Sequence, residues 1–483
     1  MNKINLNKIN IQKLRERVNN QMKESKCRGA QIGVIVDGEI IALECFGVRN
    51  DKNDPVTEKT IFPIASTTKA FTAAMVASLV DKRLLNWNDK LSKYLDDFKM
   101  MDETATKLTN IKDALSHRTG IARHDYAWMG TGFSMEQLVK NLRYLPPFAE
   151  FRTVFHYSNI MYSTVSYLVE KVTGKRWFEV MKENVTDPIG MDDTFFTVNE
   201  TMGKSDYALP FKELDGVRKD YSLFNLDNNA GAGAINSNIK DMMKWVKFLL
   251  NEGEVDGKQI VSKANLLETF RPTIIADNSS FWKTPEFKNR TYALGWYNEV
   301  FRGMTMMRHT GGINGFFSQV LFIPEKQIGV VVLTNTDGSD ICGLISNQIV
   351  DEILGFETID YWNNINKIQD ETISNGYKKN RDYFNPLLET GSKSNRENSD
   401  YEGTYINPAY PTVTVKSING ELTVETIAGT LKANHLFSDT FVLDFNGQMY
   451  IPVEFEANEN DEIERMKLRI EHNLPFGIEF IKN

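Results

Sequence analysis

The sequence predicts an α/β (α+β) fold in which early and late strands share one sheet around inserted helices, with an all-β barrel after it. Residues 31–43 are rich in strand-forming side chains, residues 60–250 follow a mainly helical pattern, and residues 292–333 return to strands. Because helices and strands come in blocks, a βαβ repeat is not expected. From residue 401 onward, short alternating strands separated by turns predict a small barrel or meander.

The first elements follow from the spacing of apolar residues. Residues 11–22 are expected to form a helix, because apolar side chains recur at every fourth position on one face: Leu14, Val18 and Met22. The two arms of the segment 31–43 flank Asp37-Gly38, a dipeptide typical of tight hairpin turns. We therefore expect a helix followed by a β-hairpin.

The composition excludes several classes of protein. The chain has 483 residues, of which 41% are hydrophobic and 25% charged, and its net charge is −8. This hydrophobic content supports packed cores and argues against wholesale disorder. The negative charge argues against a nucleic-acid-binding protein, which needs a cationic surface. Uninterrupted apolar runs are too short to span a bilayer, so no membrane span is expected.

The N-terminus and the cysteines predict a cytoplasmic location. The first residues, Met1-Asn-Lys-Ile-Asn-Leu, lack the apolar stretch of a secretory signal. The three cysteines are an odd number spread over a long chain, which is not the pattern of a disulfide framework: Cys27, Cys45 and Cys342. Both observations fit a reducing compartment.

A change of composition divides the chain. We expect a main domain at residues 1–360, a linker or loosely packed helical connector at residues 361–400, and a small β-barrel domain at residues 401–483. Strands of the barrel are expected at residues 413–415, 422–424, 441–445 and 466–470, with turns at Asn419-Gly420 and Asn446-Gly447.

Ser66-Thr-Thr-Lys69 opens an apolar helix and can form a nucleophile with its base. Residues three apart share a helix face, so Lys69 Nζ can reach Ser66 Oγ within one turn. A serine hydroxyl reacts poorly until a base takes its proton, and lysine is a base only when uncharged. Lowering its pKa from about 10.4 to about 7–8 costs roughly 4 kcal/mol, so the site must be dry and partly cationic.

This short motif is not specific by itself. Ser-x-x-Lys occurs again at Ser237–Lys240, where Ser237 is expected to cap a helix, and at Ser280–Lys283. Ser66 could likewise be a simple helix cap. Tyr-x-Asn occurs four times: at Tyr157–Asn159, Tyr361–Asn363, Tyr383–Asn385 and Tyr405–Asn407. The order and context of several motifs must therefore decide.

Three ordered segments resemble the signature elements of the serine β-lactamase and penicillin-binding-protein superfamily. They are Phe62-Pro-Ile-Ala-Ser66-Thr-Thr-Lys69, Phe155-His-Tyr157-Ser-Asn159 and Arg308-His309-Thr310-Gly311-Gly312. The likeness covers roughly residues 10 to 350. It is similar to the class C, D-aminopeptidase and carboxylesterase branch, where Tyr-x-Asn replaces Ser-Asp-Asn. This resemblance implies a β-lactamase/transpeptidase-like antiparallel sheet flanked by a helical region.

The resemblance also implies roles for the residues that match. Ser66 would be the nucleophile that becomes acylated, and Lys69 would accept or relay its proton. Tyr157 would be the second acid/base group and protonate the leaving group, while Asn159 would orient Lys69 and the substrate amide. A sheet-edge strand beginning at His309 would line the cleft with Thr310, Gly311 and Gly312. The backbone N–H groups of Gly312 and Ser66 would form an oxyanion hole.

Other histidines and glycines are given structural interpretations. His117 is expected to make structural hydrogen bonds in a loop, and His124 and His156 to lie at the surface or behind the site. The chain has neither His-Glu-x-x-His nor Cys-x-x-Cys spacing, so no metal is indicated. Gly231 and Gly233 lack the third glycine of a dinucleotide-binding loop, and no cofactor is expected.

His309 sets this chain apart from the lactam-hydrolysing relatives, which usually carry lysine there. Histidine supplies a positive charge only in part at neutral pH. We therefore expect a serine hydrolase that acts through an acyl-enzyme on small-molecule or short-peptide substrates, such as D-aminoacyl amides, in the manner of a D-aminopeptidase. Carboxylesterase or β-lactamase activity is an alternative, and so is a penicillin-binding sensor that acylates without turnover.

The last segment resembles the lipocalin-like barrel that some peptidases of this superfamily carry. The similar portion is Tyr401-Glu-Gly-Thr-Tyr405 followed by Val413-Thr-Val415. The resemblance implies that the barrel restricts access to the cleft or mediates homo-oligomerisation. A passive stabilising domain and an interaction module are the alternatives.

Overall fold

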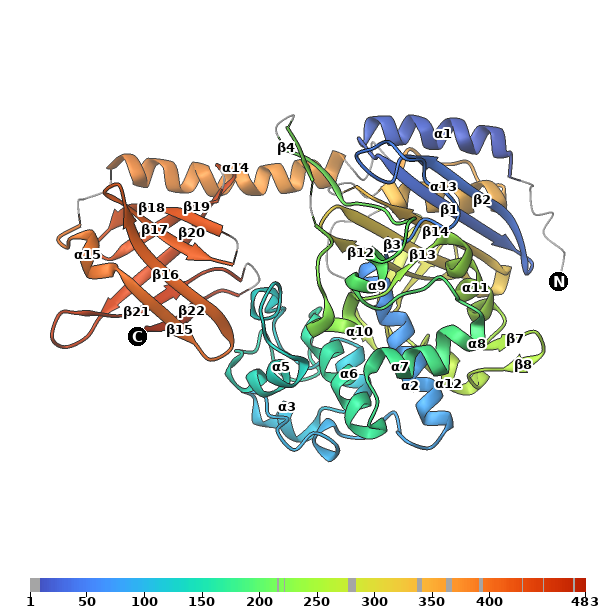
Figure 1. Cartoon of the computed structure of the whole chain (residues 1–483), viewed down its shortest axis with the longest axis horizontal. Coiled ribbons are helices and arrows are strands. Elements are labelled where there is room, and N and C mark those ends of the chain that lie inside the picture. Colours follow the sequence, from blue (N-terminus) through green and yellow to red (C-terminus); the bar gives the residue numbers. More distant parts are fainter. Residues whose placement is uncertain are drawn as a thin grey trace.

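The computed structural model describes residues 9–214, 217–220, 222–276, 284–336, 341–361, 367–390, 394–427, 429–445, 447–471 and 474–483. Within these residues the chain forms a main domain with one large sheet and a separate C-terminal barrel, and the long helix α14 (Lys367–Thr390) runs between them (Figure 1). Ser280–Lys283, Asn363 and Asn446, which the sequence motifs include, lie outside the described residues.

In the described part of the main domain the large sheet has eight antiparallel strands. In spatial order they are β2 (Glu39–Gly47), β1 (Gly29–Val36), β14 (Ile328–Thr334), β13 (Phe316–Ile323), β12 (Met304–Ile313), β11 (Tyr297–Phe301), β10 (Phe287–Tyr292) and β9 (Ile274–Ile275). The predicted hairpin is joined directly to the late strands, because Val34 of β1 lies opposite Val330 of β14. The expected α/β (α+β) arrangement is confirmed.

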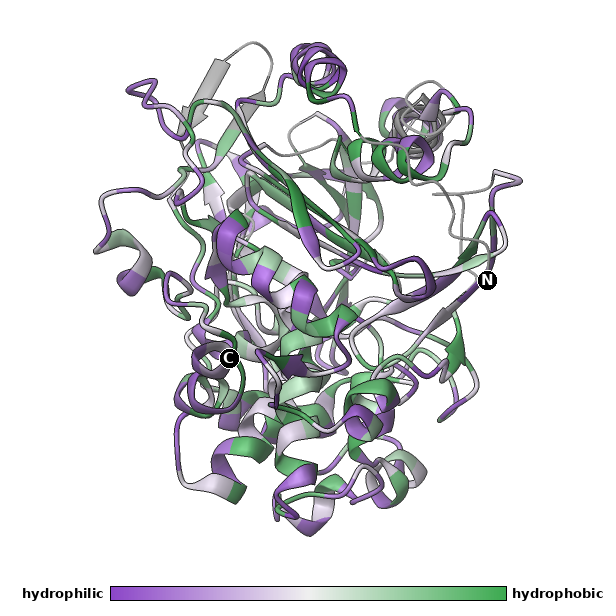
Figure 2. Cartoon of the chain, turned by 90° about the vertical axis from the view of Figure 1, so that its right-hand side faces the viewer, coloured by the Kyte–Doolittle hydropathy of each residue, from purple (hydrophilic) through white to green (hydrophobic). Residues whose placement is uncertain are grey.

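Helices cover both faces of this sheet, so its central strands are buried along their whole length. Val330 and Val332 belong to the core that contains residues of α1 (Ile11–Glu24) and α13 (Ile341–Leu354). Val331 and Leu333 face the opposite core, which contains residues of α11 (Ile239–Leu250). Hydrophobic residues run along the central strands, whereas outer helix surfaces are more hydrophilic (Figure 2). The predicted face of α1 is buried as expected: Leu14, Val18 and Met22.

The helical region lies between β3 (Phe62–Pro63) and the late strands of the sheet. Its helices are α2 (Thr68–Asp81), α3 (Glu103–Leu108), α4 (Ile111–Leu115), α5 (Met135–Asn141), α6 (Asn159–Thr173), α7 (Trp177–Met181), α8 (Asp187–Ile189), α9 (Val198–Met202), α10 (Ala230–Gly233), α11 and α12 (Lys263–Glu268). Helix α2 is buried on nearly every side, because its residues are small or apolar all round. It is the central helix of the domain. No helix within the described ranges has the length and apolar character needed to cross a bilayer.

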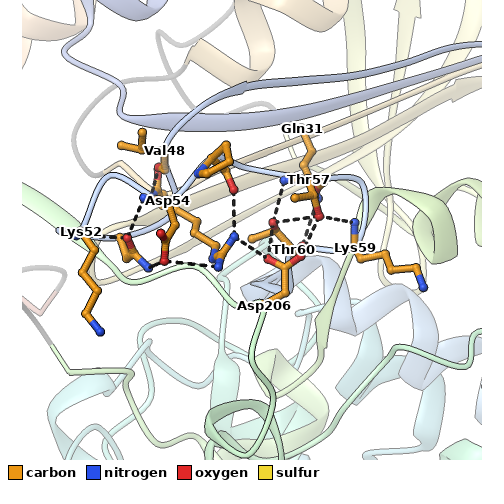
Figure 3. Close-up of polar contacts among 12 residues, drawn as sticks. Gln31, Val48, Lys52, Asp54, Thr57, Lys59, Thr60 and Asp206 are labelled. Atoms are coloured by element: carbon orange, nitrogen blue, oxygen red, sulfur yellow. Dashed lines mark hydrogen bonds and ion pairs between the residues drawn. The ribbon is translucent and has the colours of Figure 1, made fainter.

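A polar network fixes the chain that leads from the hairpin to α2 (Figure 3). The Asp206 carboxylate accepts hydrogen bonds from Thr57 Oγ1 at 2.7 Å and Thr60 Oγ1 at 2.6 Å. The Asp206 carbonyl accepts from the Ile61 N–H at 2.9 Å, and Arg49 pairs with the carboxylate at 3.4 Å. Because β3 follows at once, the network sets where α2 begins.

The C-terminal domain is a closed barrel. Its strands are β15 (Gly403–Asn407), β16 (Tyr410–Ile418), β17 (Glu421–Thr426), β18 (Gly429–Phe437), β19 (Thr440–Phe445), β20 (Met449–Ala457), β21 (Ile463–Leu468) and β22 (Ile478–Lys482). Buried and exposed residues alternate along β16, as expected for strands with one face inward. The predicted barrel is confirmed, but β21 ends at Leu468, so the last two residues of the segment 466–470 lie beyond it.

The connector contains the helix α14, which packs on the barrel. The Asn380 side chain donates to the Tyr450 carbonyl at 3.1 Å and accepts from the Tyr450 N–H at 2.7 Å. Both groups of one backbone unit in β20 are thus satisfied by a single side chain. The helix is therefore attached to the barrel through a strand backbone.

Candidate active site

Ser66 lies in a short 3₁₀ turn, η1 (Ala65–Thr67), that leads into α2. Ala65 has a φ of 46°, a left-handed conformation that is uncommon for a residue with a Cβ. Such strain is concentrated at functional sites, because the surrounding structure must enforce it. The capping position of α2 is Thr67, and the Ser66 hydroxyl makes no capping bond. The alternative in which Ser66 is a simple helix cap is therefore wrong.

Lys69 is fully buried beside Ser66. Its Nζ lies 3.1 Å from Ser66 Oγ, as the three-residue spacing predicts. It lies 2.8 Å from Asn159 Oδ1 and 2.9 Å from the carbonyl oxygen of Ala232 in α10. All three contacting atoms are uncharged oxygens. The Nζ also lies 4.8 Å from the ring centre of Tyr157.

The surroundings favour the uncharged amine. Burial lowers the pKa of Lys69 well below its usual range, and the nearby Arg123 cation lowers this pKa further, while Asp125 opposes them. A neutral amine has two N–H donors and one lone pair. The two donors match the amide and carbonyl oxygens, which cannot donate, and the lone pair is left for the Ser66 hydroxyl. The contacts of Lys69 therefore match those of an uncharged amine.

Tyr157 lies two residues before the start of α6, and its ring lies over the same amine. Burial raises the pKa of its hydroxyl above the usual value, the neighbouring Tyr297 adds to this, and a hydrogen bond with Ser66 acts in the opposite direction. The phenol therefore keeps its proton at neutral pH. The Arg123 guanidinium lies 5.1 Å from the ring centre on the pocket side. Tyr157 is thus placed to donate a proton near Ser66.

Asn159 is held in one orientation. Its Nδ2 donates to Asp125 Oδ1 at 3.0 Å, which forces Oδ1 to face Lys69. Asp125 Oδ1 also accepts from Trp128 Nε1 at 3.0 Å, and Oδ2 pairs with Arg123 Nε. A carboxylate has the acceptors for all these donors. Asp125 therefore fixes the amide that contacts the amine.

His309 differs from its prediction. Strand β12 begins at Met304 rather than at His309. It lies between β11 and β13, and His309 is 1% exposed at the first position beyond its pairing with β11. The lining of the cleft begins further along the strand, at Gly312. His309 Nδ1 donates to the Thr310 carbonyl at 2.7 Å, because a carbonyl only accepts, and Nε2 then accepts from the Tyr292 hydroxyl at 3.0 Å. Burial lowers the pKa of His309 to about 3, so the ring is neutral.

Gly311 brings strand β12 against the turn η1 that contains Ser66. A Cβ at Gly311 would lie 2.1 Å from the Ile64 carbonyl and 2.9 Å from the Ser66 nitrogen, so this approach requires glycine. Gly312 lines the pocket next to it. In the pairing of β11 with β12 the last partner is Arg308, so His309 to Ile313 extend past the end of β11. Strand β12 therefore reaches Ser66 at a point beyond the end of β11.

A cavity of about 270 Å³ opens beside Ser66. Its lining mixes aromatic, aliphatic and polar side chains with the backbone of the nucleophile turn: Ala65, Ser66, Arg123, Trp128, Met129, Asn159, Phe224, Leu226, Asn229, Ala232, Gly233, Gly312, Ile313 and Asn314. This volume is at the small end for ligand pockets. The site is suited to a compact group.

Two protein-family models match this chain. A family model described as Beta-lactamase matches residues 14–346, and a second model, a domain of unknown function (DUF3471), matches residues 389–479. This chain belongs to the beta-lactamase family. That family is part of a serine hydrolase superfamily. In this chain a closed C-terminal barrel follows the family domain.

Two fungal relatives of this beta-lactamase-family protein are named hydrolases. The chain is 31% identical over 399 residues to "Unguisins hydrolase ungD'" of Aspergillus campestris, covering 79% of this chain and 73% of the relative. It is 28% identical over 473 residues to "Unguisins hydrolase ungD" of Aspergillus violaceofuscus, covering 90% and 83%. An octameric penicillin-binding protein homologue from Pyrococcus abyssi superposes with a TM-score of 0.65 at 22% identity, covering 98% of this chain and 100% of that one, which shows a shared fold.

The sequence did not predict two residues of this candidate site, Arg123 and Asp125. Both lie in the irregular segment after α4, where the sequence offers neither periodicity nor a repeated motif. His124 between them was expected at the surface or behind the site; it is fully buried with a φ of 46°. The adjacent Arg-His-Asp order was the available signal, since binding and catalytic residues occur disproportionately on loops.

The remaining sequence interpretations have mixed outcomes. His117 makes the expected structural contact, since its Nδ1 accepts from the Ser158 N–H at 3.1 Å. His156 is half-buried and stacks on Phe148 with ring centres 4.1 Å apart. Ser237 does not cap α11, because the neighbouring Asn238 accepts the capping hydrogen bond from Asp241. The prediction was displaced by one residue.

Proposed function

We propose that this protein is a serine hydrolase in which Ser66 forms an acyl-enzyme with small amide or ester substrates. The observation that carries the proposal is the contact of Ser66 Oγ with a buried Lys69 amine whose other partners are uncharged oxygens. The hydrolase names of the two fungal relatives support the reaction class.

The proposed reaction has three proton transfers in each half: from Ser66 to Lys69, from Tyr157 to the leaving group as its bond to the carbonyl carbon breaks, and from Lys69 back to Tyr157. Lys69 Nζ takes the Ser66 proton while Oγ bonds to the substrate carbonyl carbon, and the carbonyl oxygen becomes negatively charged. The backbone N–H groups of Ser66 and Gly312 would stabilise that oxygen, and one such donor is typically worth about 3–4 kcal/mol. Tyr157 gives its proton to the leaving amine or alkoxide and regains one from Lys69. Water then repeats the sequence on the acyl-enzyme.

The charge balance of the pocket supports substrates without a firmly bound carboxylate. His309 is neutral, and the Arg123 cation is paired with Asp125. Neither supplies an unbalanced positive charge at the position where lactam-hydrolysing relatives carry lysine. We therefore infer that short peptides, D-aminoacyl amides and esters are better substrates than β-lactams. The pocket volume supports the same conclusion, because it suits a small acyl group.

Labelling followed by turnover tests the reaction. A fluorophosphonate should add covalently to the Ser66 peptide, and Ser66→Ala should abolish the adduct, as seen by peptide mass spectrometry. A fluorescent penicillin distinguishes enzyme from sensor: an adduct that decays indicates turnover, whereas a stable adduct indicates a penicillin-binding sensor. Equal labelling of wild type and Ser66→Ala would refute the proposal.

Steady-state rates test the substrate class. A D-aminoacyl anilide, a p-nitrophenyl ester and a cephalosporin should be compared under the same conditions. We expect the anilide or the ester to give the highest kcat/KM, and their ratio separates peptidase from carboxylesterase. A cephalosporin that is faster by orders of magnitude would contradict the inference and indicate a β-lactamase.

The Pyrococcus abyssi homologue bears on assembly, because it is described as octameric. We propose that this chain also self-associates. Light scattering after size-exclusion chromatography should give a mass that is a multiple of 55.2 kDa. A mass equal to one chain at micromolar concentration would count against the proposal.

A further inference from the structure

The barrel contacts the main domain at the segment that positions Asn159. Asp125 begins the short 3₁₀ turn η3 (Asp125–Ala127), and residues of β16 pack against this turn. Glu471, which lies beyond the end of β21, accepts a hydrogen bond from the Tyr126 N–H at 3.0 Å through Oε1. A carboxylate of the barrel is therefore bonded to the backbone of the turn that contains Asp125.

A second barrel residue, Tyr410, continues this contact. Its hydroxyl lies 3.3 Å from Glu471 Oε1 and 2.5 Å from His124 Nδ1. His124 Nε2 donates to the Pro146 carbonyl at 2.8 Å, because that oxygen only accepts, so Nδ1 of the neutral ring must accept from Tyr410. The Tyr410 proton is then used, and the hydroxyl can accept from a protonated Glu471. Three side chains from the two domains form one hydrogen-bonded chain.

The three hydrogen-bonded side chains are buried where the barrel meets the main domain. His124 is 0% exposed, Tyr410 4% and Glu471 6%. Apolar residues of the barrel and of the main domain belong to one continuous core cluster. Buried polar groups are costly unless all are satisfied, and a satisfied set permits one geometry. The polar chain therefore specifies how the barrel lies against η3.

The position of η3 determines the orientation of the Asn159 side chain, which contacts the Lys69 amine. Asp125, the residue next to Tyr126, accepts from Asn159 Nδ2, and Asn159 Oδ1 contacts Lys69 Nζ. Displacing the Tyr126 backbone would displace Asp125 and release the Asn159 amide. The path from Glu471 to Lys69 thus consists of consecutive hydrogen bonds and one peptide unit.

We propose that Glu471 is a positioning residue of the hydrolase site: the barrel holds η3 through it, and η3 in turn orients Asn159 and Lys69. This inference rests on the proposed function, because it requires that Lys69 act on Ser66. It gives the barrel a part in catalysis that is separate from covering the cleft or joining subunits.

Ionisable groups surround Glu471 from both domains. Asp125 and Tyr126 face it from η3, Tyr410 faces it from β16, and His156 lies near His124. Burial raises the pKa of Glu471 to about 7, with Asp125 adding to this effect, and burial lowers the pKa of His124 to about 4. The protonated Glu471 that donates to Tyr410 is therefore favoured below about pH 7, whereas above it the carboxylate still accepts the hydrogen bond from the Tyr126 N–H.

The test compares variants that remove or keep the contact. Glu471→Ala leaves the Tyr126 N–H without its acceptor, whereas Glu471→Gln keeps an oxygen acceptor and a donor but no charge. Tyr410→Phe removes the central hydroxyl. Its matched control is Tyr405→Phe, since the Tyr405 hydroxyl is equally buried but bonds within the barrel, to the Tyr401 carbonyl at 2.8 Å.

Two measurements are made on each full-length variant: the rate of Ser66 labelling by a fluorophosphonate, and amide hydrogen exchange of peptides covering residues 118–129. We expect Glu471→Ala and Tyr410→Phe to slow labelling roughly 10- to 100-fold, because small displacements of a base are costly. Exchange in residues 118–129 should rise in the same variants. Tyr405→Phe should match wild type in both measurements, and Glu471→Gln should label within about two-fold of it.

The outcomes separate the two proposals. Unchanged exchange at residues 118–129 in Glu471→Ala shows that the barrel does not hold η3 and overturns the inference, whatever the labelling. Raised exchange with unchanged labelling shows that η3 is held but does not position the base, and also overturns it. Slow labelling in Glu471→Gln as well as in Tyr405→Phe indicates general loss of barrel structure and counts against it. If wild type labels no faster than Ser66→Ala, the proposed function itself fails, and the positioning role fails with it.

Discussion

Lys69 and Arg308 are both basic side chains buried in the main domain, yet their surroundings are opposite. Arg308 on β12 is 1% exposed and faces Glu299 on β11, with Nε 2.8 Å from Oε2 and Nη2 donating to Oε1 at 2.9 Å. Lys69 on α2 is 0% exposed and contacts uncharged oxygens. Arg308 is therefore paired with a carboxylate, whereas the contacts of Lys69 are all uncharged.

The difference shows how one domain keeps a buried arginine charged while it lowers the pKa of a buried lysine. An arginine cannot give up its proton inside a protein, so burying it requires a nearby anion. A lysine can lose its proton, and desolvation without a paired carboxylate makes the neutral amine the stable form. Arg308 therefore joins two strands, whereas Lys69 is available to accept the proton of Ser66.

Replacing Lys69 removes the reactive half of this comparison and should have the largest effect. We expect Lys69→Ala to lower the rate of Ser66 labelling by a fluorophosphonate roughly 10²- to 10⁴-fold, the usual contribution of a general base. The matched control is Lys82→Ala at the other end of α2, whose amine contacts Asn184. Labelling of Lys69→Ala at the wild-type rate would show that the amine is not the base.

Removing Glu299 would take away the carboxylate that pairs with the buried Arg308 and also with Arg290. Because arginine stays charged, we expect Glu299→Ala to reduce the free energy of unfolding by about 3–5 kcal/mol, measured by denaturant titration. Glu44→Ala is the control, since its partner Arg15 is 54% exposed and such surface pairs contribute about 0–1 kcal/mol. Equal losses in the two variants would refute the contrast between buried and surface pairs.

Asp125 tests whether Lys69 depends on a carboxylate that does not pair with it directly. Its contact with Lys69 runs through the Asn159 side chain. Asp125→Ala frees the Asn159 amide to turn, so that Nδ2 can face Lys69 in place of Oδ1. We expect labelling of Ser66 to slow about 10- to 100-fold with little change in the melting temperature. Asp89→Ala, which removes a partner of Tyr94 at 2.6 Å far from the site, serves as the control. A rate within two-fold of wild type would remove Asp125 from the account, by the same estimate of about 10-fold or more for a misplaced base.

The sequence predicted those parts of the fold that depend on local pattern. The Asp37-Gly38 hairpin, the buried face of α1 and the alternating barrel strands follow from periodicity and turn chemistry. The contact of Ser66 with Lys69 follows from helical spacing. These features are decided within a few residues of the chain.

The features that were missed depend on contacts between distant segments. The order of strands places β12 inside the sheet, and no local pattern indicates that His309 is buried and neutral. Asp125 reaches Asn159 across 34 positions, and Glu471 reaches Tyr126 across 345. The cap of α11 moved from Ser237 to Asn238 because both residues are suitable caps and tertiary packing chose between them.

The pH dependence of Ser66 labelling tests the central claim that Lys69 is uncharged when it acts. Because burial lowers the pKa of Lys69, the amine should lose its proton below the usual lysine range. The rate constant for fluorophosphonate labelling should therefore rise with pH and reach a plateau well below pH 10, and this rise should be absent in Lys69→Ala. A rate that keeps increasing through pH 10, or the same profile in Lys69→Ala, would contradict the account.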